Sequence, residues 1–289
     1  MELIAASRIV KAQQRVDAAR PYSEQITKVI ANLASAGAGL DHPLLVVREP
    51  VARVGLVIIT ADRGLAGAYN SNVIRLAEKR IAEETAAGRD VAIVPVGKKI
   101  QGYCKYRGHA FDQSYIGMSD KPTFEDASQV ARYVMELYAA GEVDIVEIVS
   151  TQFFSAFTQR PVVRRLLPLE PPEPQQAAGP HSGAAAAHSE GPQASYEFEP
   201  EPDGILDRLL PRYVEARLFA AMLDSAASEH AARQRAMKTA TDNAEELIET
   251  LTRVANQARQ SEITTEIMEI VGGAEALRQA AKAKEEMSE

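Results

Sequence analysis

Residues 219–258 read FAAMLDSAASEHAARQRAMKTATDNAEELIETLTRVANQA, and mainly apolar side chains recur along them at alternating steps of four and three. We call these positions the C-terminal stripe: Phe219, Leu223, Ala226, His230, Arg233, Met237, Ala240, Ala244, Leu247, Leu251, Val254 and Ala258. A mean repeat of about 3.5 residues keeps one face of a helix turned toward a partner helix. The spacing therefore predicts a long coiled-coil helix.

The beginning of the chain carries the same repeat. Its positions are Ile9, Ala12, Val16, Ala19, Ser23, Ile26, Ile30 and Leu33. We expect residues 1–40 and 203–289 to form two coiled-coil helices, the second of which ends in a charged tail. Pro21 and Pro211 should each kink or start a helix locally, because proline lacks the backbone N–H and clashes with the preceding turn.

Between these helices, residues 48–169 predict an α/β domain. Apolar runs at 54–60, 90–96 and 143–149 are typical of buried parallel strands, and residues 160–169 suggest another. Helical spacing at 70–87 and 124–140 separates these runs. Strands that alternate with helices favour an open, mostly parallel, Rossmann-like sheet. Residues 170–202 are rich in Pro, Ala and Gly, and we expect them to be a disordered insertion.

Composition excludes several classes of function. The net charge of −8 argues against a general nucleic-acid binder, which needs excess positive charge. Cys104 is the single cysteine, so an intrachain disulfide is impossible. No apolar run approaches the roughly 20 residues of a membrane span, and residues 1–20 lack a signal-peptide pattern. We expect a soluble protein of a reducing compartment.

Length implies a partner for the C-terminal helix. Residues 213–271 would form about 90 Å of helix, whereas a domain the size of the α/β segment has a radius of gyration of about 14 Å. An unaccompanied helix would leave its apolar side chains in water. Either another chain surrounds this helix or the protein dimerises through it.

Few residues suggest chemistry. The loop at 62–72 lies between a strand and its helix, where α/β folds bind phosphates, but it matches neither G-x-G-x-x-G nor the Walker pattern. The histidines lack metal spacing, and we predict no catalytic, cofactor or metal site. A nucleotide-binding α/β regulator that dimerises through its long helices remains the alternative hypothesis.

Residues 259–267, RQSEITTEI, interrupt the repeat, because Ala258 to Ile263 is a step of five. Their planar donors and amides could hydrogen-bond a partner surface. Spacing alone favours a charged, solvated turn of helix.

Two C-terminal segments resemble a known family. They are ARQRAMKTATDNA at 232–244 and NQARQSEITTEIMEIVGGA at 256–274, and both are similar to the C-terminal helix of the gamma subunit of F-type ATP synthase. TADRGLAG at 60–67 and MELIAAS at 1–7 also resemble family segments. The resemblance covers nearly the whole chain outside 170–202.

This resemblance implies a central-stalk rotor without an active site or cofactor of its own. In the family, an antiparallel coiled coil turns inside three alpha and three beta subunits, while the α/β domain sits against the epsilon subunit and the membrane c-ring. Proton-driven rotation of the ring then drives ATP synthesis from ADP and phosphate. A bacterial member would be a peripheral protein on the cytoplasmic face of the cell membrane.

The resemblance also assigns residues. Arg259, Gln260 and Thr264 match positions that contact a beta-subunit loop, and Tyr213 and Glu215 match the epsilon/c-ring foot. Family members usually carry about twenty more residues before the position of Met1, ending in a K-I-T-K-A-type run, and their absence would shorten the coiled coil. We expect a misassigned start codon, with a natural truncation as the alternative. The tail at 282–289 should emerge from the apolar sleeve or be disordered. The cysteine pair of the redox-regulated chloroplast form is absent, which argues against thiol switching.

Overall fold

The computed structural model describes residues 2–35, 42–169 and 202–286. Its elements follow in the order α1 (Glu2–Ser35), β1 (Arg53–Ile59), α2 (Tyr69–Ala86), β2 (Asp90–Val96), α3 (Lys98–Arg107), α4 (Phe124–Ala139), β3 (Ile145–Phe153), β4 (Gln159–Leu167) and α5 (Pro202–Glu286). They divide into two compact units, Met1–Met237 and Lys238–Glu289. The insertion expected at 170–202 lies outside the described residues, apart from Pro202, the first residue of α5.

The sheet has the order β2-β1-β3-β4. Strand β1 pairs in parallel with both β2 and β3, and β4 lies antiparallel to β3. The β3–β4 connection is a short hairpin loop, which can join only antiparallel strands. The predicted class, an open and mostly parallel α/β sheet accompanied by two long terminal helices, is confirmed.

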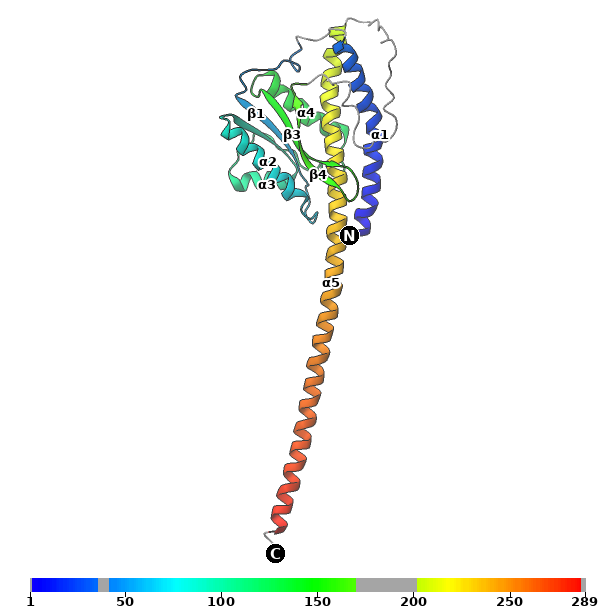
Figure 1. Ribbon diagram of the computed structural model, residues 1–289, viewed down its shortest axis with the longest axis vertical. Helices are drawn as coiled ribbons and strands as arrows, with labels where there is room; N and C mark the ends of the chain where they lie inside the picture. Colours follow the sequence, from blue (N-terminus) through cyan, green and yellow to red (C-terminus); the bar gives the residue numbers. More distant parts are fainter. Residues whose placement is uncertain (1, 36–41, 170–201, 287–289) are drawn as a thin grey trace. The chain divides into compact units, whose positions relative to one another are not determined.

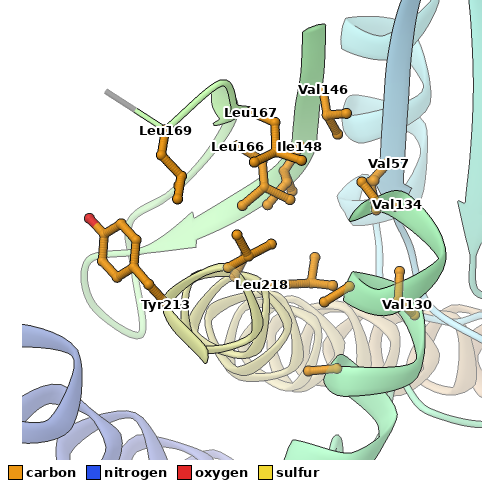
Figure 2. Close-up of a cluster of buried hydrophobic side chains, with 14 of the residues drawn as sticks. Val57, Val130, Val134, Val146, Ile148, Leu166, Leu167, Leu169, Tyr213 and Leu218 are labelled. Carbon is orange, nitrogen blue, oxygen red and sulfur yellow. The ribbon is translucent and has the colours of Figure 1, made fainter. Parts of the chain in front are cut away.

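Each face of the sheet packs against helices (Figure 1). Successive β1 side chains point to opposite faces, as the pleat requires. Leu56 and Ile58 face α2 and α3, where they pack with residues such as Val73 and Ile100. Val57 belongs to a larger core that includes side chains of α4 and α5. In Figure 2, Leu218 of α5 lies in this core between the sheet and α4.

Helices α1 and α5 run antiparallel within the first unit. Ile26 and Ile30 of α1 share a core with Leu206 and Leu210 at the start of α5. At the other end of α1, Arg8 ion-pairs with Asp120, whose carbonyl oxygen is a hydrogen-bond partner of His230 on α5. The beginning of α1 therefore lies near residue 230 of α5, and the end of α1 lies near the beginning of α5, as expected for antiparallel helices. Stripe positions are buried on both helices: Ile9, Ala12, Ile26, Ile30, Leu223, Ala226, His230 and Arg233.

One helix differs from expectation. Helix α3 was not predicted, because only Ile100 and Cys104 of its residues are buried and the rest lack helical periodicity. Helix α5 begins at Pro202, one residue before the expected start at 203, and Leu206 and Leu210 are buried in its first turns. Pro21 and Pro211 lie inside helices, and neither starts one. Among the described helices, none combines the length and the apolar character that crossing a membrane requires.

Candidate functional site

The second unit presents an uncovered apolar surface. Leu247, Leu251 and Val254 of the C-terminal stripe are 58%, 57% and 52% exposed. Every residue from 240 to 279 is exposed. Aliphatic side chains that repeat along an exposed helix mark an interaction surface, because a folded chain rarely leaves such a row in water. This part of α5 is therefore built to lie against another surface.

The predicted beta-subunit contact residues lie on this exposed helix. Arg259 and Ile263 are four residues apart, as are Gln260 and Thr264, so the two pairs lie side by side on the helix surface. The Thr264 hydroxyl donates to the Gln260 carbonyl oxygen at 2.7 Å, which leaves its oxygen lone pairs free to accept. Within the described ranges, no hydrogen bond or ion pair engages the Arg259 guanidinium or the Gln260 carboxamide. These groups form a polar patch beside an aliphatic row.

The predicted foot residues lie elsewhere, in the interior of the first unit. Tyr213 belongs to the core that α5 forms with the sheet (Figure 2). The centre of its ring lies 5.6 Å from the Arg217 guanidinium. Glu215 is buried and accepts hydrogen bonds from the Ser128 hydroxyl at 2.6 Å and from Arg212 at 2.9 Å. Because Ser128 belongs to α4, Glu215 ties α5 to α4. Neither foot residue is brought together with Arg259, Gln260 or Thr264, which belong to the other unit.

The loop weighed as a phosphate site has its polar groups bound by the chain itself. The Asp62 carboxylate accepts hydrogen bonds from the backbone N–H groups of Lys98, Gly117 and Ser119 at 3.0, 2.9 and 3.1 Å. Asn70 Oδ1 accepts from the Ala61 N–H at 2.9 Å. These bonds join the carboxyl ends of β1 and β2 to the segment before α4. Nothing in this geometry favours the nucleotide-binding alternative.

Helix α5 covers the same edge of the sheet through a polar contact that we call the α5 junction, formed by Glu229, His230, Arg233, Gly64 and Asp120. The Arg233 guanidinium donates to Glu229 Oε1 at 2.6 Å and to the Gly64 carbonyl oxygen at 3.3 and 3.4 Å. Two of its residues could be noticed from the sequence, since His230 and Arg233 are polar residues at positions of an otherwise mainly apolar stripe. Nothing in the sequence pattern marked Glu229, Gly64 or Asp120.

Burial determines the charge states near this junction. Desolvation lowers the pKa of His230, so the ring is neutral near pH 7. Its Nδ1 faces an Arg233 nitrogen at 3.5 Å, and a guanidinium only donates. Nε2 therefore carries the proton and donates to the Asp120 carbonyl oxygen at 3.2 Å. Nearby on α5, desolvation raises the pKa of Asp224 to about 6, against the attraction of Arg164 and Arg20.

The chain is similar to known proteins over nearly its whole length. The sequence profile described as ATP synthase matches residues 1–277. The ATP synthase gamma chain of Frankia casuarinae is 52% identical over 281 residues, which are 96% of this chain and 91% of the relative. The gamma chain of Heliobacterium modesticaldum is 47% identical, with coverage of 96% and 92%.

Solved structures share the fold. The central stalk and c-ring structure of the Tetrahymena thermophila mitochondrial ATP synthase contains a chain with a TM-score of 0.59 at 20% identity, with coverage of 83% of this chain and 97% of that one. A Euglena gracilis mitochondrial ATP synthase structure, of OSCP, F1 and c-ring, gives 0.56 at 18% identity, with coverage of 96% and 97%. About half of the residues are identical to those of these curated relatives across almost the whole chain, and the chain therefore belongs to the ATP synthase gamma chain family.

Proposed function

We propose that the chain is the central-stalk rotor of an F-type ATP synthase and couples proton-driven rotation of the membrane c-ring to ATP synthesis. The observation that carries the proposal is the uncovered aliphatic row on α5 in a chain of this family. Residues 238–286 make about 70 Å of helix. A surrounding ring of alpha and beta subunits, three of each, would cover that row and remove it from water.

In this role the chain performs no bond chemistry. A rotating helix changes a catalytic site only if it binds the site's conformations with different free energies. A helix whose polar patch lies on one side meets this condition, because each beta subunit faces the patch at a different rotation angle. The patch of Arg259, Gln260 and Thr264 is our candidate for the contact with a beta-subunit loop.

For the foot we propose an indirect role. Tyr213 and Glu215 are buried in the first unit, so they would shape the surface that meets the epsilon subunit and the c-ring rather than form it. The Ser128–Glu215 hydrogen bond fixes α5 to α4 at this level. The rotor would then work as a peripheral protein at the cytoplasmic face of the cell membrane.

The test uses the whole enzyme in membrane vesicles. The double variant Arg259→Ala/Gln260→Ala should assemble normally and synthesise ATP about fivefold more slowly, the lower end of typical coupling between sites. Arg278→Ala/Gln279→Ala is the matched control, because it removes the same two side-chain types from a later part of α5, and its synthesis should stay near wild type. Equal rates in the two variants would contradict the assigned contact. Failure of the wild-type chain to co-purify with large nucleotide-binding subunits would contradict the rotor itself.

A further inference from the structure

The α5 junction contains an ion pair on a part of the helix whose other buried side chains are small. Glu229 is 1% exposed, and its carboxylate receives the Arg233 guanidinium at 2.6 Å. The neighbouring buried positions are small: Ser225, Ala226, Ala227, Ser228 and Ala231. Small side chains allow close approach but interlock weakly, so at this level of α5, beyond the larger buried side chains Leu218 and Met222, packing contributes little to fixing the rotation of the helix about its axis. Polar pairs in such places are best attested as devices that fix register rather than as sources of stability.

Two directions of contact are present around the helix. Arg233 lies four residues after Glu229 on the same side of the helix, and its guanidinium joins the Glu229 carboxylate to the Gly64 carbonyl oxygen. The Glu229 carboxylate also interacts with Ser119. His230 follows Glu229 by one residue, a turn of about 100° around the axis. Its imidazole contacts Asp120, which is also held by Arg8 of α1 through a two-oxygen pair at 2.6 and 2.7 Å. Rotation of α5 about its axis would break both sets of contacts.

The contacted loops are themselves fixed. Asp62, two residues before Gly64, binds three backbone N–H groups from the segments at 98 and 117–119. Asp120 directly follows one of those segments. The junction therefore connects α5 to a rigid edge of the sheet, not to a free loop.

We infer that Glu229, through Arg233, is a positioning residue that fixes the rotation of α5 against the α/β sheet, so that torque passes from the sheet domain into the helix. This inference rests on the rotor function proposed above. Glu229 touches no reacting group, and its effect is on how much rotation reaches the exposed part of α5.

The test compares ATP-driven proton pumping with ATP hydrolysis in membrane vesicles that carry the whole enzyme. Glu229→Gln should lower the protons pumped per ATP hydrolysed about fivefold, and Glu229→Asp, which keeps the carboxylate, should recover most of the ratio. Glu84→Gln is the matched control: Glu84 is an equally buried carboxylate, held by Arg80 at 2.6 Å and Arg89 at 2.9 Å, and belongs to α2. It should lower stability and leave the ratio unchanged. A normal ratio in Glu229→Gln, or an equal loss in Glu84→Gln, overturns the torque role.

A second measurement separates the junction from the rotor. Hydrogen exchange on the full chain alone should show faster exchange of the amides at 62–67 in Glu229→Gln, and unchanged exchange there in Glu84→Gln. Unchanged exchange at 62–67 in Glu229→Gln overturns the inference whatever the enzyme assay gives. If the wild-type chain does not join the catalytic subunits, the rotor proposal and the torque role fail together, while faster exchange in Glu229→Gln alone still supports the positional contact.

Discussion

The two halves of the C-terminal stripe share one spacing and differ in their surroundings. Leu223 and Ala226 are buried within the first unit, whereas Leu247 and Leu251 in the second are exposed. Nothing in the repeat distinguishes them. A repeat of about 3.5 residues states that a helix face has a partner, and it does not state whether the partner is the same chain.

Small residues explain how part of the buried half comes close to the sheet domain. The buried half is rich in alanine and serine, with Ala226, Ala227 and Ser228 in succession. Small residues suit the close approach of backbone segments such as the loop at Gly67, whose added Cβ would lie 3.7 Å from the Ala236 Cβ. Alanine content does not separate the halves, because the exposed half carries Ala240, Ala244 and Ala258 at stripe positions beside its larger aliphatic residues.

The sharpest way to test this contrast is to make the same substitution, leucine to alanine, on α5 in each of the two units. Leu218→Ala removes a fully buried side chain and should lower the free energy of unfolding of the isolated chain by about 4 kcal/mol. Leu251→Ala should change it by less than about 0.5 kcal/mol, since the side chain is already in water. Denaturant unfolding measures both values. In the assembled enzyme the difference between the two stability losses should be smaller, because Leu251 would then be covered. A large loss of stability for Leu251→Ala in the isolated chain would show that this half has a partner within the chain.

Two glycines give a second contrast, because replacing one by alanine should destabilise the chain and replacing the other should stabilise it. Gly97 has φ 104°, and a Cβ there would lie 2.2 Å from the Thr60 carbonyl oxygen. Gly97→Ala should therefore destabilise the chain by about 3 kcal/mol. Gly273 lies in exposed helix with no atom within 4 Å of an added Cβ, so Gly273→Ala should stabilise that helix locally by about 1 kcal/mol. Thermal unfolding tests the first change, and helix content measured by circular dichroism tests the second. If both substitutions destabilise or both stabilise, the expected backbone conformations are contradicted.

A pH effect should be confined to the buried half. Asp224 has a folded pKa of about 6, above its ordinary value of 3.8. The folded state therefore binds this proton more tightly than the unfolded state, and the associated stability is present below about pH 4 and lost as pH rises through about 6. Asp224→Asn removes this dependence. The stability of wild type relative to Asp224→Asn should fall by about 2 kcal/mol between pH 4 and 7, as followed by denaturant unfolding at each pH; a constant difference would contradict the shifted pKa.

The smallest contrast concerns two threonines. Thr123 begins α4 with a capping box, in which its hydroxyl oxygen accepts from the Asp126 N–H and Asp126 accepts from the Thr123 N–H. Thr123→Ala should lower stability by about 1 kcal/mol. Thr264→Ala, in exposed mid-helix, should be neutral or stabilise α5 by a few tenths of a kcal/mol. Thermal unfolding of the isolated chains decides between them, and equal losses would contradict the difference in role.

The sequence predicted most of the sheet, because its strands are continuous apolar runs and their intervening helices are amphipathic. Strand β4 was predicted from a weaker run, and its antiparallel direction follows from the short hairpin after β3. Helix α3 was missed because it buries only two side chains. The C-terminal helix was expected from residue 203, and α5 begins at Pro202, where burial of Leu206 and Leu210 stabilises its first turns.

The functional residues divide differently. Arg259, Gln260 and Thr264 were assigned from resemblance, since exposed polar residues on a helix have no periodicity of their own. Tyr213 and Glu215 were assigned the same way, and only the structure shows that they lie inside the first unit. Glu229 could not be found from sequence, because its role depends on Gly64 and Asp120, which are distant along the chain.

The crevice at the carboxyl ends of parallel strands is where open α/β sheets ordinarily hold their small-molecule ligands. Here the ends of β1 and β2 lie against Met222, Ser225, Ala226 and Glu229 of α5. Helix α5 of the same chain thus lies where a small-molecule ligand would bind in other open α/β sheets. A small molecule that entered that crevice would have to displace a helix of the same chain, whose local concentration is very high because it is covalently attached.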